Sequence, residues 1–141
     1  MFFSEYRHNI DAKGRLSIPS DMRNQCGDSV FVTKGHDGCL AVYTEEGWEE
    51  YYKELLTLSK KKAKVRQYIR TITARVKKCD FDKLGRINIP LVLREAGHLV
   101  KECSIIGVGD YIEIWDSQMW DDYYNEGIES FDDISEELDD E

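Results

Sequence analysis

The chain has 141 residues, of which 41% are hydrophobic and 33% are charged, and this composition excludes a low-complexity or fibrous protein. Its apolar runs last only a few residues, and its N-terminus lacks a basic region followed by an apolar core. We therefore expect neither a membrane span nor a signal peptide. The four cysteines show no Cys-x-x-Cys spacing, so we expect free, mostly buried thiols in a reducing compartment.

The formal net charge of −9 conceals an uneven distribution. All 19 lysines and arginines, with 14 of the 28 acidic residues, lie within residues 1–109. The other 14 acidic residues lie in residues 110–141, which contain no lysine or arginine. Between Lys60 and Lys78, nine of nineteen residues are basic. The negative total therefore does not exclude a phosphate-rich partner, because a basic surface remains in the body of the chain.

The sequence contains an internal duplication with an offset of 71 residues, which becomes 72 after one inserted residue. The corresponding parts are 11–19 (DAKGRLSIP) and 82–90 (DKLGRINIP), Arg23 and Arg94, Trp48 and Trp120, Tyr51 and Tyr123, and Tyr52 and Tyr124. Each copy is too short to bury much core alone. We therefore expect the copies to share a core or to pair about a pseudo-two-fold axis.

Each copy begins with a pattern of strand, turn, strand and helix. Residues 6–18 alternate around Lys13-Gly14, which predicts a β-hairpin with Arg15 near its tip, and residues 77–89 repeat this layout around Gly85. A proline then opens a short helix and a glycine ends it, because proline suits the first helical turn and glycine the C-terminal cap. These helix boundaries are Pro19 and Gly27 in the first copy, and Pro90 and Gly97 in the second.

Two further strands and a helix are predicted in each copy. The strands cover 30–34 and 39–43 in the first copy, and 103–108 and 111–115 in the second. Thr44 and Asp116 are good N-caps for the helices that carry the repeated Trp, Tyr, Tyr triplets. Each triplet lines one helical face, which indicates packing rather than base stacking.

Two segments fall outside the repeated pattern. Ser59 is a candidate N-cap for a basic helix that runs to about Thr73 and connects the copies. Beyond Gly127 the chain has few apolar residues and many acidic ones, which predicts a mobile or weakly helical tail.

The duplicated arginines, Arg15 and Arg86, are the strongest candidates for a binding role. A two-stranded ribbon fits the DNA major groove, and an arginine near its tip can bond both O6 and N7 of guanine. The neighbouring glycines allow a tight turn, and the nearby lysines can reach phosphates. The candidate DNA-binding residues are Arg15, Arg86, Lys13, Lys83, Gly14 and Gly85.

A purely structural role is the alternative for the two arginines. Asp11 and Asp82 each lie four residues before an arginine, and each pair can brace its hairpin. Both roles hold at once if the aspartate orients the arginine toward DNA. The basic stretch from Lys60 to Lys78 is either a phosphate-attracting surface or the solvated face of a connecting helix. Together with the duplicated arginines it favours a contact with the DNA backbone.

Catalysis finds no support in the sequence. The three histidines show no metal-ligand spacing, and the turn at 35–38 (GHDG) has a counterpart at 107–110 (GVGD) that lacks the histidine. No glycine-rich phosphate loop, nucleophile elbow or Cys and His pair stands out. We therefore expect no enzymatic activity, no metal and no cofactor.

At these residues the chain resembles the MraZ family, bacterial regulators built from two SpoVT/AbrB-type half-domains with an Asp-x-x-x-Arg motif in each. The resemblance rests on 11–19, on 82–90 with Leu93-Arg94 following, and on 112–115 (IEIW), and it extends to about Asn125. It implies an α+β fold in which two tandem swapped-hairpin half-domains form a small β-barrel-like unit with flanking helices. We place the half-domains at 5–47 and 76–119, a helical connection at 48–75, and a C-terminal helix with an acidic tail at 120–141.

The resemblance also implies a function. It indicates a cytoplasmic, nucleoid-associated regulator, expected to be a repressor, that binds double-stranded DNA. Such regulators form closed homo-oligomeric rings and bind tandem G-rich boxes in the promoter of the division and cell-wall gene cluster. Arg15 and Arg86 match the motif arginines, and Lys13 lies in the same loop.

Three departures from the family pattern limit this transfer. An acidic residue, Asp21, stands in the first short helix, and an apolar residue, Leu84, stands in the second turn. The acidic tail is also longer and more charged than the family pattern implies. The alternative is an antitoxin-like or other protein-interaction module whose acidic tail binds a partner.

Overall fold

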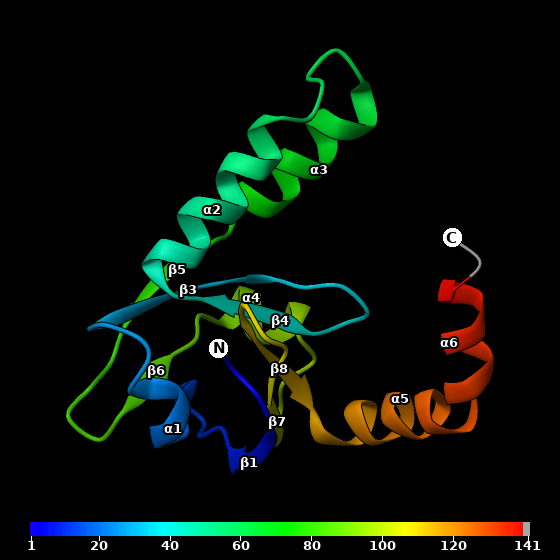
Figure 1. The fold of residues 1–141 in the computed structure, drawn as a ribbon. Coiled ribbons are helices and arrows are strands. Elements are labelled where there is room, and N and C mark those ends of the chain that lie inside the picture. Colours follow the sequence, from blue (N-terminus) through cyan, green and yellow to red (C-terminus); the bar gives the residue numbers. More distant parts are fainter. Residues whose placement is uncertain (140–141) are drawn as a thin grey trace.

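The computed structural model describes residues 1–139, so the last two residues of the acidic tail lie outside the described part. The chain is α+β, as predicted, with a sheet of antiparallel strands and helices on its periphery (Figure 1). In chain order the elements are β1 (Glu5–Asn9), β2 (Arg15–Ser17), α1 (Ser20–Arg23), β3 (Ser29–Lys34), β4 (Leu40–Tyr43), α2 (Glu45–Leu56), α3 (Ala63–Ala74), β5 (Lys77–Asp80), β6 (Arg86–Asn88), α4 (Leu91–Ala96), β7 (Glu102–Gly107), β8 (Ile112–Asp116), α5 (Ser117–Glu129) and α6 (Phe131–Asp139).

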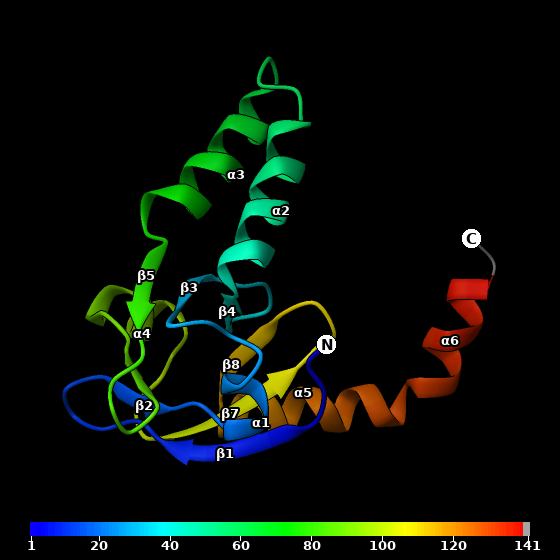
Figure 2. The same ribbon diagram turned by 60° about the vertical axis from the view of Figure 1, so that its left-hand side comes forward.

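The two copies interleave in the sheets. Six strands follow the order β1-β7-β8-β4-β3-β5, and β2 pairs with β6 in a separate two-stranded sheet. The first strand of each copy therefore lies beside a strand of the other copy, since β1 pairs with β7 and β5 pairs with β3. The copies also meet in the middle of the sheet, where β4 pairs with β8. Figure 2 shows β1 and β5 at opposite edges of this arrangement.

This pairing corrects the prediction of two local β-hairpins. The turns at Gly14 and Gly85 are present, but the strands on either side of each turn do not pair with one another. Two backbone hydrogen bonds close each turn, and the chain then diverges toward strands of the other copy. The alternation of residues identified the strands and the turns. It carried no information about the partner of each strand, because the same apolar side chains suit a local or a distant neighbour.

The interleaving gives the molecule one shared core. Leu16 and Ile87 face each other across β2 and β6, and both are fully buried. The strands β3, β4, β7 and β8 add buried aliphatic side chains to the same cluster. Because each copy alone would leave its aliphatic side chains uncovered, the duplication is needed to bury them. The predicted sharing of a core is confirmed.

The predicted helix caps are mostly correct. The Thr44 hydroxyl accepts a hydrogen bond from the Gly47 amide at 3.0 Å, and the Asp116 carboxylate accepts one from the Met119 amide at 3.1 Å. Gly97 is the C-cap of α4, whereas α1 ends earlier than expected, at Arg23. The capping role predicted for Ser59 is wrong, because α3 begins after Lys62 and has no side-chain cap.

The predicted packing of the aromatic triplets on α2 and α5 holds for their tryptophans, whereas Tyr52, Tyr123 and Tyr124 are 40–48% exposed. The Trp48 ring stacks on Phe31 of β3, with 5.8 Å between the ring centroids. In the second copy, Trp115 of β8 contacts the rings of Trp120 and Tyr123. All four cysteines are free thiols, and three of them are buried. None of the helices within residues 1–139 is both long enough and apolar enough to cross a membrane.

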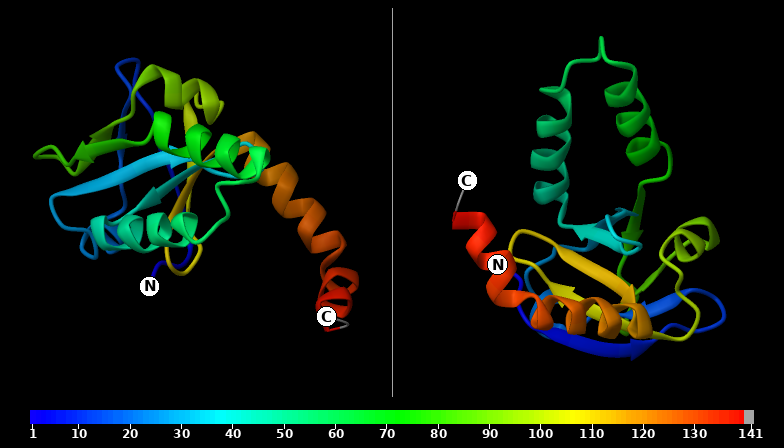
Figure 3. Two further views of the ribbon diagram at one scale, coloured as in Figure 1. Left: turned by 90° about the horizontal axis from the view of Figure 1, so that it is seen from above. Right: turned by 90° about the vertical axis from the view of Figure 1, so that its right-hand side faces the viewer.

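Two helical projections leave the sheet in different directions. Helices α2 and α3 extend side by side from the β3 and β4 side, and the connection between them lies at their far end (Figures 1 and 3). Helix α5 leaves β8 and continues into α6, which confirms the helical alternative for residues 128–139 of the tail. Figure 3 shows α6 well separated from α2 and α3.

Candidate nucleic-acid interface

The small sheet of β2 and β6 brings the duplicated arginines together. Its register pairs Arg15 with Asn88 and Ser17 with Arg86. Side chains alternate between the two faces of a strand, so these four residues share the face opposite the buried Leu16–Ile87 pair. Arg15 and Arg86 are thus diagonal neighbours, a position whose spacing is roughly 7–8 Å in an antiparallel pair. One composite face therefore carries one arginine from each copy.

The Asp11 carboxylate organises the first turn. Its Oδ1 atom accepts hydrogen bonds from the backbone amides of Lys13 at 3.0 Å and Arg15 at 2.9 Å. Its Oδ2 atom accepts a third from Nε of the Arg15 side chain at 2.6 Å. The Gly14 amide donates to the Asp11 carbonyl, and the Asp11 amide donates to the Arg15 carbonyl. The aspartate thus fixes both the backbone of the turn and the direction of the arginine.

The second turn repeats these contacts. Asp82 Oδ1 accepts hydrogen bonds from the amides of Leu84 and Arg86, both at 2.9 Å. Asp82 Oδ2 accepts one from Arg86 Nε at 2.8 Å. These donated hydrogen bonds, the backbone amide of the arginine first among them, hold the pKa of both aspartates below its ordinary value. Both carboxylates are therefore ionised at neutral pH.

The brace uses only part of each guanidinium group. Within the described residues, the Nε atom is the one guanidinium nitrogen of Arg15 and of Arg86 that forms a hydrogen bond. Their side chains are 37% and 27% exposed. The terminal nitrogens, which form the fork that can bond guanine O6 and N7, are left without a protein partner. The contacts expected for bracing by the aspartates are present, and they leave the terminal nitrogens of each arginine available.

Gly14 and Gly85 are required by the turns for two reasons. Their φ angles are +90° and +76°, in the left-handed region that L side chains rarely adopt. Both glycines also lie against the other copy. An ideal Cβ on Gly14 would lie 2.6 Å from the Ile89 carbonyl oxygen, and one on Gly85 would lie 2.2 Å from Nη1 of Arg23.

Sequence reasoning did not assign the second pair of duplicated arginines to this site. Arg23 Nη1 donates to the Ile18 carbonyl at 2.9 Å and lies against Gly85, a residue of the other copy's turn. Arg94 Nε likewise donates to the Ile89 carbonyl at 2.9 Å and lies against Gly14. The sequence does contain a signal for this pair, because Arg23 and Arg94 are separated by the same 71 residues as the two motifs. The cross-contact is visible only in three dimensions.

Two polar residues of the composite face were also missed. Ser17 and Asn88 occupy equivalent positions in the two copies and lie directly opposite Arg86 and Arg15. An asparagine on such a face can bond adenine N6 and N7, and a serine can bond several base edges or phosphates. The sequence does contain a signal for them, because a polar residue stands two positions after each motif arginine.

The lysines do not form one surface. Lys13 and Lys83 are exposed in the two turns, beside the composite face. Lys60, Lys61 and Lys62 lie in the connection between α2 and α3, at the far end of that projection from β2 and β6 (Figures 1 and 2). The predicted basic stretch is therefore divided among a remote tip, the helix α3 and the strand β5, which carries its last two lysines.

Comparisons with known proteins agree with the repeat. The model of the MraZ protein family, whose description relates it to antitoxins, matches residues 1–70 and again residues 72–141. The chain is 45% identical over 138 residues to the transcriptional regulator MraZ of Ligilactobacillus salivarius, an alignment that covers 98% of this chain and 96% of the relative. It is 41% identical over 140 residues to the regulators of the same name from Lactobacillus johnsonii and Lactobacillus gasseri, with 99% of this chain and 98% of each relative covered.

The chain belongs to the MraZ family. Each of the two family matches contains one Asp-x-x-x-Arg turn, so the duplication in this MraZ-family chain is a property of the family model as well as of the fold. Relatives of this similarity align over nearly their whole length, so the family assignment applies to the helical projections as well as to the strands.

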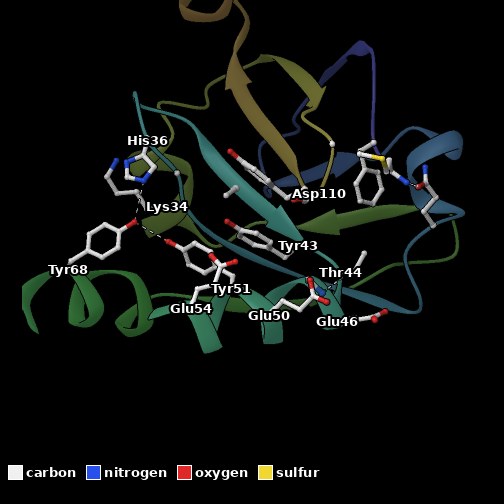
Figure 4. Close-up of a pocket in the computed structure, with 18 residues that line it drawn as sticks. Lys34, His36, Tyr43, Thr44, Glu46, Glu50, Tyr51, Glu54, Tyr68 and Asp110 are labelled. Atoms are coloured by element: carbon white, nitrogen blue, oxygen red, sulfur yellow. Dashed lines mark hydrogen bonds between the residues drawn. The ribbon is translucent and has the colours of Figure 1, made fainter. Parts of the chain in front are cut away.

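A cavity lies elsewhere, between α2, β4 and the turn before β8 (Figure 4). It has a volume of about 640 Å³ and is lined by the stacked rings of Tyr43, Tyr51 and Tyr111. Burial raises the pKa of Tyr43 to about 12. Exposed glutamates of α2 lie around the cavity and would repel phosphate. In this MraZ-family chain the cavity thus differs in charge from the arginine face. Residues 1–139 contain no group of three or more His, Cys, Asp or Glu side chains arranged to hold a metal ion.

Proposed function

We propose that this chain is a transcriptional regulator that binds double-stranded DNA through the composite face of β2 and β6. The two-stranded ribbon enters the major groove, where Arg15 and Arg86 each bond O6 and N7 of a guanine. Lys13 and Lys83 contact the flanking phosphates. The relatives at 41–45% identity carry the name of transcriptional regulator, which supports a role at a promoter.

One observation carries this proposal. The two arginines lie on one outward face, each held by an aspartate through Nε alone, with the terminal nitrogens left for a partner. An oriented guanidinium loses little rotamer entropy when it binds, so the ion pair prepares the side chain for recognition. A purely structural pair would not require the exposure that both arginines retain.

The proposal extends to assembly and to the site on DNA. The protein acts as a repressor at the nucleoid in the cytoplasm, forms a homo-oligomeric ring, and binds tandem G-rich boxes in the promoter of the division and cell-wall gene cluster. A ring that presents many copies of one face gains affinity for repeated boxes, because linked weak contacts multiply through effective concentration. The protein performs no catalysis in this role and needs no cofactor.

Fluorescence anisotropy tests the DNA contact. The probe is a labelled duplex from the region upstream of the protein's own gene, and a scrambled duplex of the same composition serves as its reference across a salt series. We expect the Arg15→Ala, Arg86→Ala double variant to lose the preference for the promoter duplex. The control variant, Lys34→Ala with Lys101→Ala, removes the same two charges from exposed positions outside the face and should keep the preference. Equal preference in the wild type and the arginine variant would contradict the proposal.

A second titration tests the tandem arrangement. Duplexes with one, two and four boxes are compared at constant length. Affinity should rise steeply with the number of boxes. A single-box duplex that binds as tightly as the four-box duplex would contradict the ring as the source of affinity.

A further inference from the structure

An unpartnered apolar stripe runs along α5 and α6. The two helices are broken at Ser130, and each presents large side chains at intervals of three or four residues, the spacing of one helical face. They are exposed by 47–65%, and they are Tyr124, Ile128, Phe131, Ile134 and Leu138. Isolated apolar residues on a surface are ordinary, but two successive helices that each expose apolar side chains mark a surface that another protein surface covers.

The stripe is flanked by negative charge. Residues 117–139 contain aspartates and glutamates but no lysine or arginine. The start of α5 is fixed to β1, because the Trp120 indole donates to Glu5 at 2.6 Å and Asp121 forms an ion pair with Arg7. The fixed base directs α6 away from the sheet and from the helices α2 and α3 of its own chain (Figure 3). The apolar stripe therefore needs a cover from another molecule.

The complementary surface is the outer part of the α2–α3 projection, made of its basic tip (residues 57–62) and the helix α3. Leu56 and Leu58 at its outer end are 45% and 41% exposed. The surrounding basic residues are Lys60, Lys61, Lys62, Lys64, Arg66 and Arg70, and no acidic residue occurs between Lys60 and Lys78. Helix α2 itself carries five glutamates, so the positive charge of the projection belongs to the basic tip and to α3. The tip and α3 thus combine exposed aliphatic side chains with positive charge, whereas α5 and α6 combine exposed apolar side chains with negative charge.

We propose that α5 and α6 of one copy dock on the basic tip and α3 of a second copy. This inference rests on the proposed homo-oligomer and names the surfaces that build it. It also assigns the basic stretch at 60–70 to assembly, not to DNA phosphates, which agrees with its distance from the arginine face (Figures 1 and 2). The acidic flanks of the stripe pair with the lysines, and the apolar side chains of both surfaces lose their contact with water.

The two surfaces are different, so the contact is head-to-tail. Every copy offers both surfaces, and one remains free after each docking step. Such a heterologous contact propagates and closes into a ring when the rotation between neighbours permits. Assembly by this contact leaves the composite face of β2 and β6 uncovered in every copy.

Charge exchange tests the docking. The basic tip is reversed in Lys61→Glu, Lys62→Glu, Lys64→Glu, and the acidic helix is reversed in Asp132→Lys, Asp133→Lys, Glu136→Lys. Light scattering after size-exclusion chromatography should give an oligomer for the wild type and the mass of one chain for each triple variant. Circular dichroism checks that both remain folded, since all six positions are exposed. The control, Lys34→Glu, Lys77→Glu, Lys101→Glu, makes the same charge change as the reversed-tip variant. These three lysines lie outside the docking surface, so the control should keep the oligomer.

Mixing the two triple variants provides the decisive measurement. The reversed tip of one variant now matches the reversed helix of the other, so an equimolar mixture should recover the oligomer mass. A mixture that stays at the mass of one chain would overturn the docking. So would a reversed-tip variant that keeps its mass and binds the promoter duplex more weakly, because the basic tip would then serve DNA.

DNA binding by each variant is measured in the same anisotropy assay. A dissociated triple variant that still prefers a single promoter box to scrambled DNA supports the arginine face whatever the docking result. An oligomer that assembles as described but shows no such preference would leave the docking intact and overturn the DNA contact.

Discussion

The first and second turns of the duplicated motif share a frame and differ at their tips. In both turns one aspartate accepts two backbone amides and the Nε atom of the motif arginine, with distances that agree within 0.2 Å. The tips are unlike, since Lys13 of the first turn occupies the position of Leu84 in the second, and Lys83 occupies that of Ala12. Leu84 is 71% exposed, so its apolar side chain is not explained by burial.

This difference separates two kinds of requirement. The aspartate, glycine and arginine are needed to close the turn and hold the guanidinium, and both copies retain them. The residues between them point outward, where they affect a bound partner and not the turn itself. The shared frame therefore predicts equal effects of equivalent frame changes, and the unlike tips predict unequal effects of tip changes.

The largest effect is expected at the motif arginines. A bidentate arginine–guanine pair contributes about 1–3 kcal/mol of discrimination, so Arg15→Ala and Arg86→Ala should each weaken specific binding roughly 5- to 150-fold. Anisotropy with the promoter duplex and its scrambled counterpart measures both variants. Similar losses would support equal readout by the two turns. A loss confined to one variant would show that only one turn contacts bases.

The glycines give the next largest effect, and they break the symmetry of the frame. Gly14→Ala and Gly85→Ala both strain a residue with positive φ, at roughly 1–3 kcal/mol each. Gly14→Ala should destabilise more, because its Cβ meets a backbone carbonyl oxygen, whereas that of Gly85→Ala meets the flexible end of Arg23. Urea unfolding measures the difference. Adding Arg23→Ala should recover part of the loss in Gly85→Ala, and no recovery would mean that strain in φ dominates.

A smaller effect is expected from Asp11→Asn, and it depends on pH. The pKa of Asp11 is lowered in the folded state, so ionisation contributes stability above the ordinary aspartate pKa of about 3.9 and this contribution is lost as pH falls through the folded-state value. The melting temperature of the variant should thus lie below that of the wild type at pH 7, and the gap should close in strong acid. Asp82→Asn should behave alike, because the contacts are equivalent. A gap that is constant across pH would exclude the carboxylate charge as its cause.

The smallest effect concerns the tips. Lys13→Ala should weaken binding to promoter and scrambled duplexes about equally and reduce the slope of log affinity against log salt by about one, because one phosphate contact is lost. Leu84→Ala, at the equivalent position, should leave the slope unchanged. Equal slopes for wild type and Lys13→Ala would remove the phosphate contact from the first turn.

The sequence alone determined the local elements and the candidate residues. The duplication, the turns at Gly14 and Gly85, the caps at Thr44 and Asp116 and the bracing aspartates all follow from patterns within a few residues, since turn and cap chemistry acts over that range. The motif identified Arg15 and Arg86 as candidates for the same reason. These features needed no knowledge of the rest of the chain.

Only the tertiary structure decided which segments meet. It paired β2 with β6, placed Arg15 and Arg86 on one face, set Arg23 and Arg94 against the glycines of the opposite copy, and separated the lysines at 60–62 from that face. Strand alternation fixes which side chains share a face but not which strand lies alongside, because many partners bury the same apolar surface equally well. The choice among them depends on the packing of the whole core, to which both copies contribute.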